Sequence, residues 1–122
     1  MDEGIRLYKE FMEGLLEQRP DMRAERIKAK NKMVWPKAEM YQKYRSFFGG
    51  LSDENKNVLA DLLQDTRDAA IFDTLEYFDD TINLDGLHVT QNGIEFPKVF
   101  FGGDFHNDWV ALLQGDFWGE NR

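Results

Sequence analysis

The fold is decided by the thirty residues from Ser52 to Thr81, SDENKNVLADLLQDTRDAAIFDTLEYFDDT. Apolar residues recur in this stretch at the spacing of an α-helix, in which each residue turns the chain by about 100°. Up to Ala70 they share one arc of the helix, and from Ile71 onward they share roughly the opposite arc. A helix that buries opposite sides at successive levels passes between two layers or breaks into two helices. We therefore expect a central helix over residues 52–81 that is long or kinked.

Further helices are predicted on both sides of the central segment. An amphipathic helix is expected from Ile5 to Leu16, and it should end before Pro20, which disfavours helical geometry in the residue preceding it. An aromatic helix is expected from Met40 to Phe48, and a short one from Phe105 to Leu113. Residues 19–36 are basic and hold few apolar side chains, so they are expected to form an irregular or mobile connection.

The period of the pattern changes after the central helix and predicts a short β-hairpin over residues 87–97. Asn92-Gly93 is the dipeptide that tolerates the positive φ angles of a tight hairpin turn. If these two residues form the turn, Thr90 pairs with Glu95 and His88 lies on the face away from the core. The predicted fold class is therefore α+β and predominantly α-helical, with about five helices around the central one and a single hairpin.

Length and composition favour one domain with a single core. The chain has 122 residues, of which 42% are hydrophobic and 14% aromatic, and we expect a single domain over residues 1–122. The absence of Cys excludes a disulfide scaffold. No apolar run approaches the ~20 residues that span a bilayer, and the N-terminus is acidic where a signal peptide is basic. A cytoplasmic location with no membrane contact is the expectation.

Charge is distributed unevenly along the chain. The net charge of −8 divides into −3 over residues 1–18, +6 over residues 19–45 and −11 over residues 46–122. The cations between Arg19 and Lys32 have no aromatic residue among them, whereas proteins that bind single strands interleave the two. The acidic remainder of the chain would also repel phosphate. Nucleic acid is therefore not an expected partner.

Motifs for chemistry are scarce. With two His and no Cys, the chain offers neither a nucleophilic triad nor a zinc pattern. Its Gly pairs lack the Lys and the Ser or Thr of a phosphate-binding loop. A calcium loop beginning at Thr81 would need an acidic first residue, and it would need Glu where Asn92 stands. We expect no catalytic residue, no metal and no cofactor.

Two classes of function remain open. The first is a non-enzymatic, acidic protein that acts by protein–protein binding, as an immunity-like or regulatory protein, and exists as a monomer or homodimer. Its partner would carry a basic surface that meets the carboxylates of Asp61, Asp65, Asp68, Asp73 and Glu76. The alternative is a small enzyme or ligand-binding domain with an aromatic pocket. The residues assigned to that pocket are Trp35, Tyr41, Tyr44, His106, Trp109 and Trp118.

A set of short motifs carries a family resemblance. They include Val58-Leu59-Ala60, Phe72-Asp73-x-Leu75-x-Tyr77, Asn92-Gly93-x-Glu95-x-Pro97 and Asp108-Trp109-Val110. From about Leu51 to Trp118 the chain resembles a family of small bacterial proteins with no assigned function. The resemblance implies a cytoplasmic bacterial domain, and it implies no activity and no catalytic or binding residue.

Overall fold

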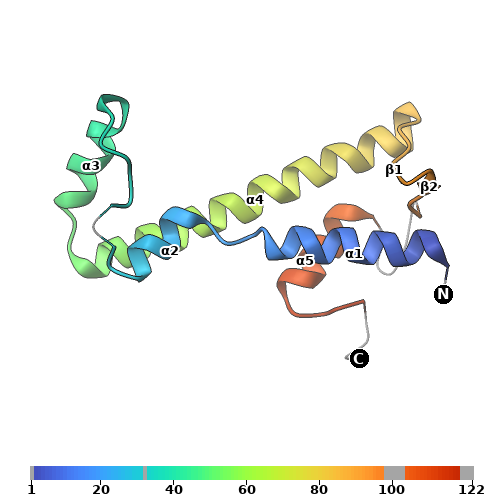
Figure 1. The fold of residues 1–122 in the computed structure, drawn as a ribbon, viewed down its shortest axis with the longest axis horizontal. Coiled ribbons are helices and arrows are strands. Elements are labelled where there is room, and N and C mark those ends of the chain that lie inside the picture. Colours follow the sequence, from blue (N-terminus) through green and yellow to red (C-terminus); the bar gives the residue numbers. More distant parts are fainter. Residues whose placement is uncertain (1, 32, 98–103, 119–122) are drawn as a thin grey trace. The chain divides into compact units, whose positions relative to one another are not determined.

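The stretch that decides the fold forms one uninterrupted helix, α4 (Asp53–Asp85), of 33 residues (Figure 1). Ser52 caps the start of α4: its hydroxyl accepts the backbone N–H of Asn55 at 3.1 Å, and its carbonyl accepts that of Lys56 at 2.9 Å. The sequence analysis left open whether this segment forms one helix or two, and the structure shows a single helix. The computed structural model describes residues 2–31, 33–97 and 104–118.

The two halves of α4 bury side chains in separate cores. Leu59 and Ala60 pack in one cluster of buried residues, whereas Leu75 and Ile82 pack in another. The reversal of the apolar arc near Ala70 therefore marks the point where the helix passes from one core to the other. It coincides with a division of the chain into two compact units, residues 20–68 and residues 1–19 with 69–122.

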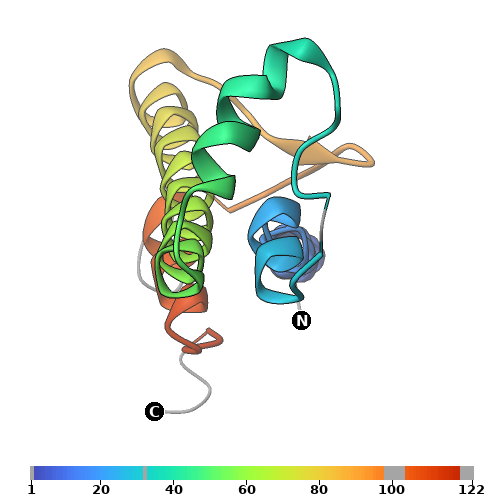
Figure 2. The same cartoon turned by 90° about the vertical axis from the view of Figure 1, so that its left-hand side faces the viewer.

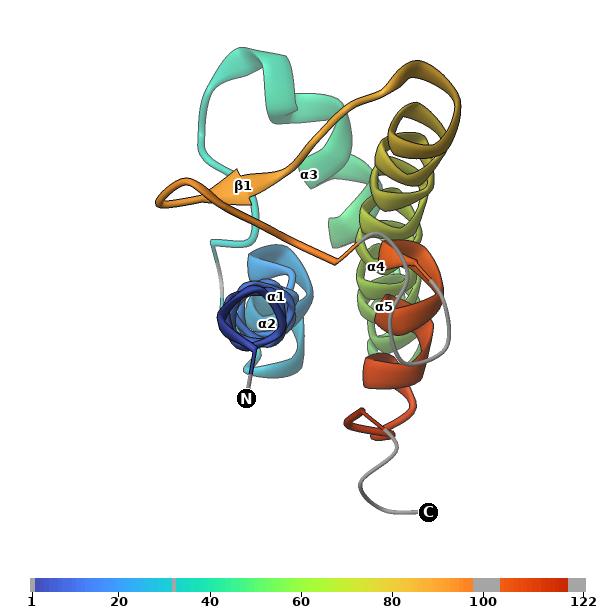
Figure 3. The ribbon, with the colours of Figure 1, turned by 90° about the vertical axis from the view of Figure 1, so that its right-hand side faces the viewer.

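The unit of residues 1–19 and 69–122 contains α1 (Glu3–Glu17), the second half of α4, a hairpin of β1 (Thr90–Gln91) and β2 (Ile94–Glu95), and α5 (Phe105–Leu113). Figure 3 looks along α1 and shows the hairpin to one side of it. The core of this unit is aromatic and aliphatic. It is formed by Leu7, Tyr8, Met12, Leu75, Ile82, Phe96, Phe105, Trp109 and Leu112.

The hairpin has the predicted register. Thr90 pairs with Glu95, and Asn92 and Gly93 take φ angles of 53° and 78° in the turn. His88 is exposed, as expected, and its Nδ1 lies 2.6 Å from a carboxylate oxygen of Glu95. Two paired residues on each strand cannot stand alone, so packing on the neighbouring helices holds the hairpin in place.

Gly4 explains how closely the hairpin approaches α1. A Cβ added at Gly4 would lie 2.6 Å from the carbonyl oxygen of Glu95, a distance that real Cβ atoms do not tolerate. Glycine in the first turn of α1 therefore admits the backbone of β2. Gly14, on the same helix, faces open space.

The unit of residues 20–68 contains α2 (Met22–Lys28), the 3-10 helix η1 (Glu39–Tyr41), α3 (Gln42–Gly49) and the first half of α4. The turn from α3 into α4 can be followed in green in Figure 2. The core of the unit of residues 20–68 consists of Ala24, Ile27, Val34, Trp35 and Ala60.

The expected irregular connection over residues 19–36 contains a helix instead. Asp21 caps α2 by accepting the backbone N–H of Ala24 at 2.9 Å, while its own N–H donates to the side-chain oxygen of Gln64 at 2.9 Å. Burial of Ala24 and Ile27 on one face then stabilises two turns. The capping residue and the two buried residues are present in the sequence. Ile27 is the one strong apolar residue of this stretch, however, so the apolar pattern was too weak to predict a helix.

The described residues thus form a mostly helical α+β structure with five α-helices and one antiparallel hairpin, as predicted. The single domain over residues 1–122 stays a prediction. Among the described helices, none combines the length and the apolar character needed to cross a membrane.

Candidate functional site

The unit of residues 20–68 contains a cavity of about 680 Å³ with several aromatic side chains in its wall, and we call it the aromatic cavity. It is lined by Arg23, Trp35, Tyr41, Lys43, Tyr44, Phe47, Leu59 and Leu63.

Three elements, η1, α3 and α4, carry six of these side chains, and Arg23 of α2 and Trp35, which precedes η1, complete the lining. Tyr41 ends η1, and Tyr44 and Phe47 lie one turn apart on α3. Leu59 and Leu63 stand at positions i and i+4 of α4, so they share one face of that helix. The resulting wall is continuous in aromatic contacts, because the ring centre of Tyr44 lies 6.3 Å from that of Tyr41 and 6.0 Å from that of Trp35.

The aromatic cavity is exposed and carries positive charge. Phe47 is 63% exposed and Tyr44 is 44% exposed, although both are large apolar side chains. The ammonium group of Lys43 lies 5.2 Å from the ring centre of Tyr44, in reach of a cation–π contact. Arg23 adds a second cation, and the described lining includes no carboxylate.

The predicted aromatic pocket divides between the two units. Trp35, Tyr41 and Tyr44 line the aromatic cavity together. Trp109 is fully buried in the core of the other unit, so it is not a pocket residue. Trp118 packs against that same core and donates its indole N–H to Glu13 at 2.9 Å.

His106 is the last of the predicted pocket residues, and it also belongs to the unit of residues 1–19 and 69–122. It does not line the aromatic cavity, and its ring contacts the carboxylates of Asp79 and Asp104 in a polar cluster described below.

The predicted acidic surface is smaller than expected. Asp68 is only 9% exposed, and it accepts a hydrogen bond from Gln64 at 3.1 Å. Asp61 is exposed but forms an ion pair with Lys28 at 3.0 Å. The remaining three carboxylates are exposed; they are those of Asp65, Asp73 and Glu76.

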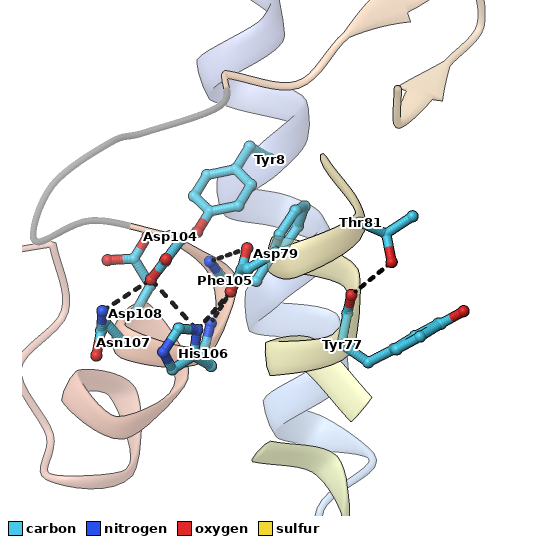
Figure 4. Close-up of polar contacts among 9 residues, drawn as sticks. All are labelled: Tyr8, Tyr77, Asp79, Thr81, Asp104, Phe105, His106, Asn107 and Asp108. Atoms are coloured by element: carbon cyan, nitrogen blue, oxygen red, sulfur yellow. Dashed lines mark hydrogen bonds and ion pairs between the residues drawn. The ribbon is translucent and has the colours of Figure 1, made fainter. Parts of the chain in front are cut away.

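A polar cluster that the sequence did not predict lies where α5 meets α4 (Figure 4). Asp79 of α4 is 2% exposed, and its two carboxylate oxygens accept the backbone N–H groups of Phe105 at 3.0 Å and His106 at 2.9 Å. These are N–H groups that the start of a helix leaves without intrahelical partners. Asp79 therefore caps α5 from another helix, whereas the side chain of Asp104, at the cap position itself, accepts from Asn107 at 2.7 Å.

The imidazole of His106 completes this cap. Its Nδ1 lies 2.6 Å from a carboxylate oxygen of Asp79 and 3.3 Å from one of Asp104. Burial lowers the pKa of His106, but the hydrogen bond to Asp79 and the negative charges of Asp104, Asp79 and Glu76 outweigh it, so its pKa lies above the ordinary value. The ring packs edge-on against Phe72, with the two centres 5.2 Å apart.

A second buried contact joins α1 to α5. The hydroxyl of Tyr8 donates to the carboxylate of Asp108, and these residues are 2% and 3% exposed. Burial together with this carboxylate raises the pKa of Tyr8, so the phenol stays protonated.

The ligand atoms of Asp79, Asp104 and His106 all lie within 4.8 Å of one another, which raises the question of a metal. Two atoms bound to one tetrahedral zinc ion at about 2.0 to 2.1 Å would stand roughly 3.3 Å apart. The separation of 2.6 Å between His106 and Asp79 is that of a hydrogen bond. Both oxygens of Asp79 are also occupied by backbone donors. We therefore interpret the cluster as a helix cap, and the absence of a metal stays a prediction.

Asp79 lies on the buried face of α4. Asp79 stands four residues after Leu75 and three before Ile82, and these spacings place all three on one face. Asp108 likewise stands three residues after Phe105, on the buried side of α5. A carboxylate at a core position of the helical pattern is therefore the feature of the sequence that indicates each of these buried acids.

Comparison with known families assigns the chain. The model of a family of unknown function, DUF6547, matches residues 1–120, so the chain belongs to this family. No curated protein matches the chain. No solved structure matches it either. The family membership agrees with the resemblance to a family without assigned activity.

Proposed function

We propose that this chain is a non-enzymatic binding protein that captures a partner protein through the aromatic cavity. The observation that supports this proposal is the exposure of large apolar side chains on a cavity with cationic members. Soluble proteins rarely leave contiguous apolar surface in water without a binding role. Burying the exposed part of Phe47 alone would contribute about 1 to 2 kcal/mol.

Exposed apolar side chains are concentrated in the same unit. Among the described residues, seven of the eleven exposed large hydrophobic side chains lie within residues 20–68. They are Met22, Met33, Met40, Tyr44, Phe47, Val58 and Leu62. Aromatic residues and Met are also the types enriched at protein interfaces.

The charge of the lining favours one kind of partner segment. Arg23 and Lys43 are the charged members of the described lining. Residues 20–68 hold ten Lys and Arg against eight Asp and Glu, whereas the rest of the chain holds five against fifteen. An amphipathic segment with apolar anchors and acidic neighbours is complementary to such a surface. The sequence analysis also predicted a partner with a basic surface that meets an acidic surface of this chain. That contact stays a prediction for the exposed carboxylates of Asp65, Asp73 and Glu76.

The cellular setting extends this proposal. We place the protein in the bacterial cytoplasm, on the resemblance and on the acidic, Cys-free composition. An immunity-like or regulatory role, as a monomer or homodimer, fits a small chain that acts by occupying a partner.

The enzymatic alternative would rest on His106 and Asp79, because an imidazole beside a buried carboxylate is the geometry of a general base. No Ser or Thr hydroxyl among the described residues is bonded to this imidazole. The carboxylate is also committed to capping α5. These contacts favour a structural role for the pair.

Affinity capture from the source organism tests the proposal. Phe47→Ser removes the most exposed aromatic group of the aromatic cavity, and Leu84→Ser is the matched control because Leu84 is 80% exposed in the other unit. We expect the wild type and Leu84→Ser to recover one specific partner, and Phe47→Ser to recover at least about tenfold less, as for a binding hot spot. Equal recovery by all three proteins, or no specific partner for the wild type, would reject the proposal.

A further inference from the structure

Residues 20–68 contain a second cavity, of about 430 Å³, with an excess of positive charge; we call it the cationic cavity. Lys30, Arg45 and Lys56 line it, and Asp53 is the only carboxylate in its described lining. The structure gives none of the three cations an ion-pair partner among the described residues. Two positive charges are therefore left uncompensated around one small volume.

Two of the three cations, Arg45 and Lys56, are held in position by groups that do not neutralise them. The guanidinium of Arg45 donates to the backbone carbonyl of Pro36 and, at 2.9 Å, to that of Ala38. The ammonium of Lys56 lies 4.9 Å from the ring centre of Phe48. Charges of one sign around a concave, partly apolar wall reinforce one another and raise the local concentration of anions.

Apolar and amide groups complete the cavity wall. Val34 and Trp35 are buried residues of the core and present apolar surface, and Asn31 and Asn57 bring amide groups that donate and accept hydrogen bonds. A volume of about 430 Å³ lies within the range of about 300 to 1,000 Å³ found for small-molecule sites. The cationic cavity has the mixed lining that such sites share.

We propose that the cationic cavity binds a small organic phosphate monoester. A monoester carries close to two negative charges above its second pKa of about 6, which matches the two uncompensated positive charges. Arg and Lys are the side chains that bind phosphate, and the apolar wall accommodates the organic group. This inference stands independently of the partner protein, because among the described lining residues only Trp35 belongs to both cavities.

Calorimetric titration with four probes tests the match. Phenyl phosphate carries both the dianion and the ring, inorganic phosphate lacks the ring, phenol lacks the charge, and benzoate carries a single charge. We expect phenyl phosphate to bind at least about tenfold more tightly than each of the other three.

Variants then locate the site. Lys30→Gln and Lys56→Gln should each weaken phenyl phosphate up to about fivefold, the range for a single partly exposed ion pair. Lys43→Gln is the matched control, because Lys43 lines the aromatic cavity and not this one, and it should leave the affinity unchanged. Amide NMR shifts should move at Asn31 and Asn57 and stay fixed in residues 69–97.

Four results would overturn the proposal. The first is a wild type that does not bind phenyl phosphate at any concentration up to its solubility. The second is an affinity for phenol, benzoate or inorganic phosphate that equals the affinity for phenyl phosphate. The third is a loss of affinity in the Lys43→Gln control as large as that in the two variants of the cationic cavity, and the fourth is no loss in those two variants.

Discussion

Asp79→Asn is the substitution for which the structure makes the sharpest prediction. The side chain of Asp79 is buried, accepts two backbone N–H groups at the start of α5, and contacts the ring of His106 at 2.6 Å. Asn keeps the shape but replaces one acceptor oxygen by an NH2 group. That donor would face either the backbone N–H of Phe105 or the donors of His106.

The magnitude follows from these contacts. A hydrogen bond to a charged group contributes about 1.5 to 3 kcal/mol, and loss of a helix cap costs about 1 kcal/mol. We therefore expect Asp79→Asn to lower the free energy of unfolding by about 3 kcal/mol at pH 6. Asp80→Asn is the matched control, because Asp80 is the exposed neighbour on α4, and its effect should stay within about 0.5 kcal/mol.

The effect of Asp79→Asn should depend on pH in one direction. The pKa of His106 is raised in the folded state, so the stability that its charged form contributes is complete below its ordinary pKa of about 6.5. That contribution is lost as the pH rises through the raised pKa. The difference between wild type and Asp79→Asn should therefore be larger at pH 6 than at pH 9, where only the backbone cap remains.

Urea unfolding followed by tryptophan fluorescence measures both effects, because Trp109 is fully buried in the affected core. The interpretation of Asp79 as a buried cap would be refuted if Asp79→Asn and Asp80→Asn were equally stable. A difference that stayed constant between pH 6 and pH 9 would refute the role assigned to the charge of His106.

Further predictions concern the contacts of α1 and use the same unfolding measurement. Tyr8→Phe removes a buried donor from the carboxylate of Asp108 and should cost about 1.5 to 3 kcal/mol; wild-type stability would contradict the importance of that bond. Gly4→Ala places a Cβ against the carbonyl of Glu95 and should cost about 1 to 3 kcal/mol. Gly14→Ala is the control for Gly4→Ala on the same helix, because its Cβ meets open space, and it should raise the free energy of unfolding by about 0.5 to 1 kcal/mol. A change in the free energy of unfolding of the same sign for both substitutions would contradict the close approach of the hairpin to α1.

Local signals in the sequence were sufficient for much of the fold. The reversal of the apolar arc near Ala70 predicted a central helix with two buried sides, and the structure places those sides in two cores. Asn92-Gly93 predicted the register of the hairpin, because two positive φ angles permit a two-residue turn. The helix of residues 22–28 was missed because its stability comes from burial of Ala24 and Ile27, which periodicity alone does not reveal.

The sites were harder to predict because they depend on contacts between residues distant in sequence. Trp35, Tyr41 and Tyr44, which the sequence analysis grouped in one pocket, lie close together along the chain and share one aromatic wall. Asp79 and His106 are 27 residues apart, and no spacing rule links a mid-helix carboxylate to the start of another helix. The cationic cavity was missed for the same reason, because its cations come from three separate segments.

The central claim is that residues 20–68 present the binding surface and that the polar cluster at Asp79 and His106 serves the fold. It is tested most directly by the dissociation constant of the purified captured partner for the wild type, Phe47→Ser, Leu84→Ser and His106→Gln. We expect Phe47→Ser to weaken binding at least about tenfold while the other two variants match the wild type. Undiminished binding by Phe47→Ser, together with a loss in His106→Gln measured on folded protein, would contradict the claim.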